Sequence, residues 1–135
     1  MIVKDIRPRG FCKGVHFAIE KVKAVLQSTQ YPKPIYILGY IVHNKHVVDA
    51  LGELGAITLD DKEKSRLELI DDIDSGTVVI SAHGTPLEVI KKIKDKGLNL
   101  VDATCKDVYV THDLIKAYLK KDYQVVYIGK KNHPE

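Results

Sequence analysis

The stretch Thr77-Val-Val-Ile-Ser-Ala-His-Gly-Thr-Pro-Leu-Glu-Val-Ile-Lys-Lys-Ile-Lys-Asp-Lys-Gly-Leu-Asn-Leu-Val101 decides the fold. Its opening, Thr77 to Ser81, has the pattern of a strand buried on both faces. Thr85-Pro-Leu-Glu88 then predicts a capping box with proline at the first helical position, and Gly97 predicts the end of that helix. Leu98 to Val101 returns to a strand pattern, so a strand, a helix and a strand follow one another here.

The same alternation extends in both directions along the chain. It predicts an α/β fold with a parallel sheet covered by helices on both faces. The segment from Asp60 to Gly76 is rich in charge and weakly periodic, so we expect a loop or a short surface helix there. The other expected elements are strands at Val3–Ile6, Ile35–Leu38, Ala56–Leu59 and Tyr123–Gly129, and helices over about 15–26, 44–54 and 108–118.

Composition narrows the class of protein. Of 135 residues, 44% are hydrophobic and 29% are charged, so the chain can bury a core and is not disordered by composition. No apolar run reaches the roughly 20 residues of a membrane span, and Met1–Asp5 lacks the apolar stretch of a signal peptide. We therefore expect a cytoplasmic protein without a membrane partner. The formal charge is +3 and lysines alternate with acids along the expected helices, so no nucleic-acid partner is expected.

Cys12 and Cys105 are the only cysteines, and each lies where an expected strand gives way to an expected helix. Thiolates are stabilised at helix N-termini, which suits metal or redox chemistry, and a reducing compartment disfavours a disulfide. Free structural thiols and a zinc site shared with two histidines both remain open. By count alone, two thiolates are too few for an iron–sulfur cluster.

Histidines also follow expected strands. Binding sites in parallel sheets form beyond the carboxyl ends of the strands, and His43, His83 and His133 all lie at such ends. Together with helix N-termini they predict a pocket for a multiply charged anion such as a diphosphate. Glu135, two residues after His133, is a candidate proton donor. The remaining histidines lie on helix bodies and are expected to be bystanders: His16, His46 and His112.

With these residues in view, the chain resembles the LytB family of 4-hydroxy-3-methylbut-2-enyl diphosphate reductases. The resemblance covers essentially the whole chain and about the first half of a typical member. The matching motifs are Arg9-Gly-Phe-Cys-Lys-Gly-Val15, Val42-His-Asn44 with Val47-Val-Asp49, Gly55-Ala56, Ser81-Ala-His-Gly84, Asp102-Ala-Thr-Cys105 and His133-Pro-Glu135.

The resemblance implies the last reaction of the non-mevalonate isoprenoid pathway, which gives isopentenyl and dimethylallyl diphosphates. It implies a [4Fe–4S] cluster held by three cysteines, of which Cys12 and Cys105 match two. His43, His83 and His133 match the diphosphate-binding histidines, and Glu135 matches the acid that delivers a proton. A reduced ferredoxin or flavodoxin is the electron donor that the family suggests.

The chain also departs from the family pattern. Lys106 replaces a proline after the second cysteine, which an early helical position should tolerate. The third cysteine is absent, so we expect a truncated, catalytically incompetent chain that holds a cluster weakly or not at all. Because the family fold has three similar α/β domains, residues 1–104 are expected to form the first, and residues 105–135 to begin the second. The alternative is an α/β domain that binds diphosphate without redox chemistry.

Overall fold

Strand β3 (Thr77–Ile80) is the most deeply buried strand of the sheet, with all its residues inaccessible to solvent. The computed structural model describes residues 2–4, 10–61 and 63–129. Within these ranges β3 pairs in parallel with β1 (Ile35–Leu38) and β4 (Asn99–Asp102), and β1 also pairs with β2 (Ala56–Leu59). The strand order is β2-β1-β3-β4, and the expected α/β class is confirmed.

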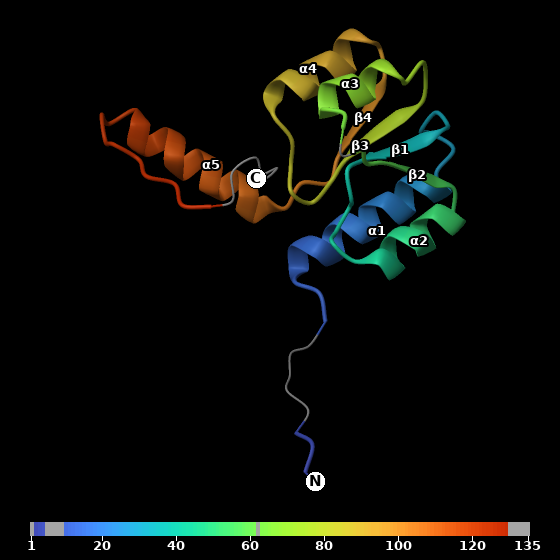
Figure 1. Ribbon diagram of the computed structural model, residues 1–135, viewed down its shortest axis with the longest axis horizontal. Coiled ribbons are helices and arrows are strands. Elements are labelled where there is room, and N and C mark those ends of the chain that lie inside the picture. The colour runs from blue at the N-terminus through green and yellow to red at the C-terminus, as the bar shows by residue number, and fades with distance from the viewer. Residues whose placement is uncertain (1, 5–9, 62, 130–135) are drawn as a thin grey trace.

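Helices cover both faces of this sheet (Figure 1). On one face lie α1 (Lys13–Gln27) and α2 (Lys45–Glu53), and on the other lie α3 (Arg66–Asp71) and α4 (Leu87–Asp95). Successive strand residues point to opposite faces, so Val79 packs with α1 and α2 whereas Val78 packs with α3 and α4. Burying each such aliphatic side chain stabilises the fold by about 1.5–3 kcal/mol.

The strand order places a topological switch point between β1 and β3. From β1 the chain crosses through α2 to β2 on one side, and from β2 it crosses through α3 to β3 on the other side of β1. The loops that leave β1 and β3 therefore diverge and open a crevice at the carboxyl ends of these strands. This is the crevice in which ligands of open α/β sheets bind.

The prediction of a capping box at Thr85 is wrong. The backbone of Pro86 stays extended, with ψ 149°, so α4 begins one residue later, at Leu87, without a side-chain cap. Instead, Ser65 and Glu68 form a complete capping box on α3, inside the segment expected to be a loop or a short helix. Both segments carry the same Thr/Ser-x-x-Glu pattern, but only Ser65 and Glu68 form the two hydrogen bonds of a capping box.

Two expected strands do not form in the described residues. Val3 and Lys4 have no strand conformation and Val3 is exposed, while Asp5 and Ile6 of the same expected strand lie outside the described residues. Residues 123–129 have no strand conformation. A strand needs a neighbour to satisfy its backbone hydrogen bonds, and no described strand lies beside either segment.

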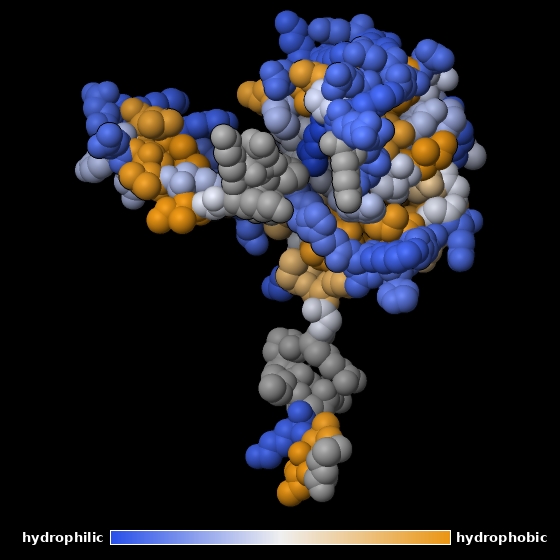
Figure 2. Space-filling model, in the orientation of Figure 1, coloured by the Kyte–Doolittle hydropathy of each residue, from blue (hydrophilic) through white to orange (hydrophobic). Residues whose placement is uncertain are grey.

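Helix α5 (Lys106–Leu119) extends away from the sheet, and no side chain on it is buried. Apolar side chains gather on its surface in Figure 2, among them Val110, Leu114 and Leu119. The helix does begin at Lys106, so the replacement of proline at this position is tolerated as expected. No helix in the described ranges is both long enough and apolar enough to cross a membrane.

Candidate functional site

Three loops at the carboxyl ends of the strands are joined by backbone hydrogen bonds. The Ala82 amide, after β3, donates to the Ile41 carbonyl, after β1, at 3.3 Å. The Cys105 amide, after β4, donates in turn to the Ala82 carbonyl at 3.0 Å. These bonds continue the parallel pairing beyond the strands. As a result, the residues that follow β1, β3 and β4 meet at one edge of the sheet.

His43 and His83 lie together at the switch point. Their ring centroids are 4.7 Å apart, with the planes inclined by 33°. Both line a cavity of about 220 Å³, the histidine cavity, whose other polar lining residues are Tyr40, Asp60, Asp61, Lys64 and Arg66. The imidazole rings and cationic side chains of this cavity favour an anion, whereas Asp60 and Asp61 oppose one, so the anion pocket stays a prediction.

Both cysteines lie at helix N-termini, as predicted. Cys12 is the N-cap of α1 and its Sγ accepts a hydrogen bond from the Val15 amide at 3.5 Å, while Cys105 is the N-cap of α5. The two thiols line one cavity of about 240 Å³, the cysteine cavity, together with His83, Asp107 and His112. Of the strand expected before Cys12, Val3 and Lys4 have no strand conformation, and its other two residues, Asp5 and Ile6, lie outside the described residues.

Gly14 makes room for Cys105. A Cβ added to Gly14 would lie 2.3 Å from Cys105 Sγ, far inside van der Waals contact. The sulfur of Cys105 therefore lies against the first turn of α1, which is the turn that Cys12 caps. The group that approaches the backbone at Gly14 is therefore a sulfur of the chain itself.

Asp102 organises the loop that carries Cys105. Its carboxylate accepts hydrogen bonds from the Thr104 amide, at 2.9 Å, and from the Tyr109 hydroxyl, while Lys21 Nζ of α1 donates to its carbonyl at 2.6 Å. Burial raises the pKa of Asp102, but the hydrogen bonds from Thr104 and Tyr109 outweigh it, so this pKa lies below its ordinary value. Tyr109 has a raised pKa, owing first to burial and then to its hydrogen bond with Asp102.

His83 connects the two cavities because it lines both of them. Its loop is hydrogen-bonded to the loop of His43 on one side and to Cys105 on the other. The structure thus brings four predicted site residues to one edge of the sheet: Cys12, His43, His83 and Cys105. The other two, His133 and Glu135, lie outside the described residues.

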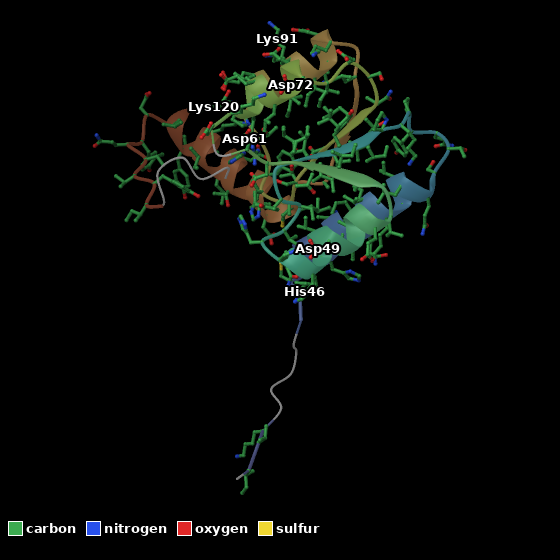
Figure 3. The ribbon with its side chains drawn as sticks, turned by 45° about the vertical axis from the view of Figure 1, so that its right-hand side comes forward. His46, Asp49, Asp61, Asp72, Lys91 and Lys120 are labelled. Carbon is green, nitrogen blue, oxygen red and sulfur yellow. The ribbon has the colours of Figure 1, made fainter. Side chains whose placement is uncertain are left out.

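The remaining histidines divide into two groups. His16 and His46 line a separate cavity between α1 and α2, and Figure 3 shows His46 well apart from Asp61, which lines the histidine cavity. His112, also expected to be a bystander on a helix body, lines the cysteine cavity. Its position on the first turns of α5, seven residues after Cys105, was the available signal.

Arg66 is the site residue that sequence reasoning missed. It begins α3, directly after the Ser65 cap, and it lines the histidine cavity. Recognition of Ser65-Arg-Leu-Glu68 as a capping box would have revealed a helix starting here, and hence a cation near the carboxyl end of β2.

The side chains available as ligands decide which metal centre the site around Cys12 and Cys105 fits. In residues 2–4, 10–61 and 63–129 no three His, Cys, Asp or Glu side chains form a group that could hold a metal ion, so a zinc site of Cys12, Cys105 and two histidines is not present there. Two thiols lining one cavity, with the Gly14 backbone against one of them, fit two ligand positions of an iron–sulfur cluster.

The chain matches the family described as LytB protein over residues 3–135. It is 55% identical over all 135 residues to the 4-hydroxy-3-methylbut-2-enyl diphosphate reductases of Bacillus thuringiensis strain Al Hakam and Bacillus cereus strain AH187, and spans 42% of their length. It resembles the solved structure of the Plasmodium falciparum E-1-hydroxy-2-methyl-but-2-enyl-4-diphosphate reductase, with TM-score 0.78 and 38% identity, over 95% of this chain and 37% of that one.

A second solved structure, of (E)-4-hydroxy-3-methyl-but-2-enyl diphosphate reductase, the terminal enzyme of the non-mevalonate pathway, gives TM-score 0.75 at 35% identity. That match covers 93% of this chain and 41% of the other. The chain therefore spans less than half the length of the relatives it matches.

Proposed function

The chain belongs to the LytB family, and from that premise we propose that it forms part of the active site of a 4-hydroxy-3-methylbut-2-enyl diphosphate reductase. The observation that carries this proposal is the position of His83, which lines both the cysteine cavity and the histidine cavity. A substrate whose diphosphate occupies the histidine cavity then has its other end directed toward the two thiols.

His43 and His83 bind the diphosphate in this proposal, and His133 joins them as the family resemblance implies. Imidazoles hydrogen-bond phosphate oxygens, and their protonated forms also contribute positive charge. Lys64 and Arg66 line the same cavity and make it more favourable for an anion, whereas Asp60 and Asp61 oppose this. Because the two cations and the two carboxylates oppose each other, the cavity needs the histidines to bind diphosphate.

Cys12 and Cys105 hold a [4Fe–4S] cluster in this proposal, as two of its thiolate ligands. Bound there, the cluster supplies the two electrons that reductive loss of the substrate hydroxyl requires. Val15, Ala82 and Val108 form an apolar part of the cavity wall around the thiols, and such a shell influences the properties of a bound cluster. Electrons come from a reduced ferredoxin or flavodoxin, in the cytoplasm.

In this proposal Glu135 delivers a proton to the substrate hydroxyl, which leaves as water. Two electrons and a second proton are then added to the remaining allylic group. The products are isopentenyl and dimethylallyl diphosphates. Residues 1–104 form the first α/β domain in this proposal, and residues 105–135 begin the second. The separation of α5 from the sheet supports this division.

The 135 residues do not complete the cluster site, since they supply two thiolates and the family uses three. Metal binding and assembly of a site are coupled, so an incomplete set of ligands holds a cluster weakly. We therefore propose that the chain alone has no reductase turnover.

Anaerobic reconstitution with iron and sulfide tests this function. Iron and sulfide bound to the wild-type chain are measured before and after a chelator, with Cys12→Ser and Cys105→Ser as variants. The wild-type chain is expected to take up iron and sulfide that the chelator removes, and each variant is expected to take up far less.

Three outcomes would decide against parts of the proposal. Equal uptake by the wild type and both variants would mean that these thiols are not ligands. A chelator-resistant cluster with turnover would show that two cysteines suffice. Binding of inorganic diphosphate by a chain that takes up no iron would favour the alternative, a diphosphate-binding domain without redox chemistry.

A further inference from the structure

We propose that Arg66 is a positioning residue that holds His83 beside His43, through a hydrogen bond to the carbonyl of Gly84. This inference rests on the proposed function, because it assigns to Arg66 the alignment of the two diphosphate-binding histidines. It concerns a residue of α3, an element that carries none of the residues expected from the sequence to form the site.

The contact of Arg66 spans the switch point. Its Nη1 donates to the Gly84 carbonyl at 2.6 Å, and a Cβ added to Gly39 would lie 3.3 Å from its Nη2. Gly39 directly follows β1 and Gly84 lies in the loop after β3. The guanidinium therefore touches the exit of β1 and fixes the loop after β3, the two chain segments that carry His43 and His83.

Gly84 closes the turn that presents His83. The Gly84 amide donates to the Ser81 carbonyl at 3.1 Å, and Gly84 has φ +81°, a left-handed conformation that glycine adopts without strain. His83 occupies the third position of this four-residue turn. A hydrogen bond to the carbonyl immediately after His83 thus sets the orientation of the turn relative to α3.

The charge of Arg66 makes this bond strong. Burial lowers the pKa of Arg66, and the neighbouring Asp60 opposes that shift, but a guanidinium remains protonated at neutral pH. Hydrogen bonds from charged donors are shorter and stronger than neutral ones. In the described residues Gly84 provides the one hydrogen-bond acceptor of this side chain, so removal of the guanidinium leaves the turn without this tether.

The test compares Arg66→Met with Lys64→Met in the full 135-residue chain. Lys64 lines the same cavity, and its removal changes the charge equally, but its ammonium pairs with Asp72 and does not contact Gly84. Nuclear Overhauser effects between the rings of His43 and His83 are measured without ligand, and the Kd for inorganic diphosphate is measured by calorimetry.

We expect Arg66→Met to weaken the ring-to-ring effects and to raise the Kd roughly tenfold. Lys64→Met is expected to leave the ring-to-ring effects unchanged, and Arg66→Lys, which keeps a charged donor, is expected to restore them in part. If Arg66→Met does not fold, Arg66→Gln, whose amide is too short to reach Gly84, replaces it with the same expectation.

Unchanged ring-to-ring effects in a folded Arg66→Met would overturn the proposal, as would equal losses in Arg66→Met and Lys64→Met, because charge alone would then explain the result. If the wild-type chain does not bind inorganic diphosphate, the proposed function of the histidine cavity fails. The ring-to-ring comparison still tests the role of Arg66 in that case, since it needs no ligand.

Discussion

At the first turn of α1, Gly14 lies against the sulfur of Cys105. This contact joins two residues that are far apart in the sequence, and it brings the second cysteine beside the helix that the first one caps. The sequence predicts that both cysteines begin helices, because strand and helix patterns meet at each. It does not predict which residue makes room for the sulfur, because that depends on how α1 and the loop after β4 pack.

Gly14→Ala is expected to destabilise the chain. Alanine favours a helix over glycine by about 1 kcal/mol, but overpacking against the Cys105 sulfur costs about 1–3 kcal/mol and outweighs this gain. Gly52→Ala is the matched control, because Gly52 also lies in a helix and a Cβ there meets no atom within 4 Å. The free energy of unfolding in urea, measured under reducing conditions, should fall for Gly14→Ala and rise for Gly52→Ala. Equal stability of the two variants would contradict the contact.

Asp102→Asn is expected to lower stability at neutral pH by about 1 kcal/mol, a modest value for bonds to a charged group because the carboxylate is partly exposed. The pKa of Asp102 is depressed in the folded chain. A carboxyl with a depressed pKa contributes stability above its unfolded pKa of about 4 and loses it as the pH falls through the folded value. The difference between the wild type and Asp102→Asn should therefore shrink below about pH 4.

Urea unfolding at several pH values measures this difference. Asp74→Asn is the control, since Asp74 is exposed and has no ion pair or hydrogen bond among the described contacts. If Asp102→Asn loses the same stability at every pH down to strongly acidic conditions, its effect is not that of an ionised carboxylate.

At the scale of elements, helix starts depend on more than the four-residue capping pattern. Ser65-Arg-Leu-Glu68 and Thr85-Pro-Leu-Glu88 both fit a capping box, but only the first forms one. Thr85 Oγ1 is instead buried, without a hydrogen-bond partner in the described part of the chain. Ser65→Ala should therefore cost about 1 kcal/mol, whereas Thr85→Val should be neutral or stabilising.

Thermal unfolding of these two variants distinguishes the two helix starts. A lower Tm for Ser65→Ala, with an unchanged or higher Tm for Thr85→Val, agrees with the structure. An unchanged Tm for Ser65→Ala with a lower Tm for Thr85→Val would mean that Thr85 does cap α4.

Strands were predictable where they have neighbours. The strands Ile35–Leu38, Ala56–Leu59 and Thr77–Ile80 form as their apolar patterns predict, because each pairs with another strand. The apolar segment 123–129 has the same kind of pattern and no strand partner in the described residues. The apolar pattern of a segment indicates its tendency to form a strand. Whether it finds a neighbouring strand to pair with depends on the whole fold.

At the scale of the molecule, the switch point between β1 and β3 assembles the site. The sequence predicts that residues after parallel strands meet at one edge, and His43, His83 and Cys105 do so, with Cys12 of the α1 N-terminus beside them. It does not reveal strand order, and strand order is what sets His43 beside His83 and brings Arg66 across to Gly84. The placement of His133 and Glu135 stays a prediction.

The most direct test of a single continuous site is a titration of the wild-type chain with inorganic diphosphate, followed by two-dimensional NMR of the histidine rings. The ring signals of His43 and His83 are expected to shift together and saturate, while those of His16 and His46, in their separate cavity, stay in place. Shifts centred on His16 and His46, or no shift at His43 and His83, would contradict it.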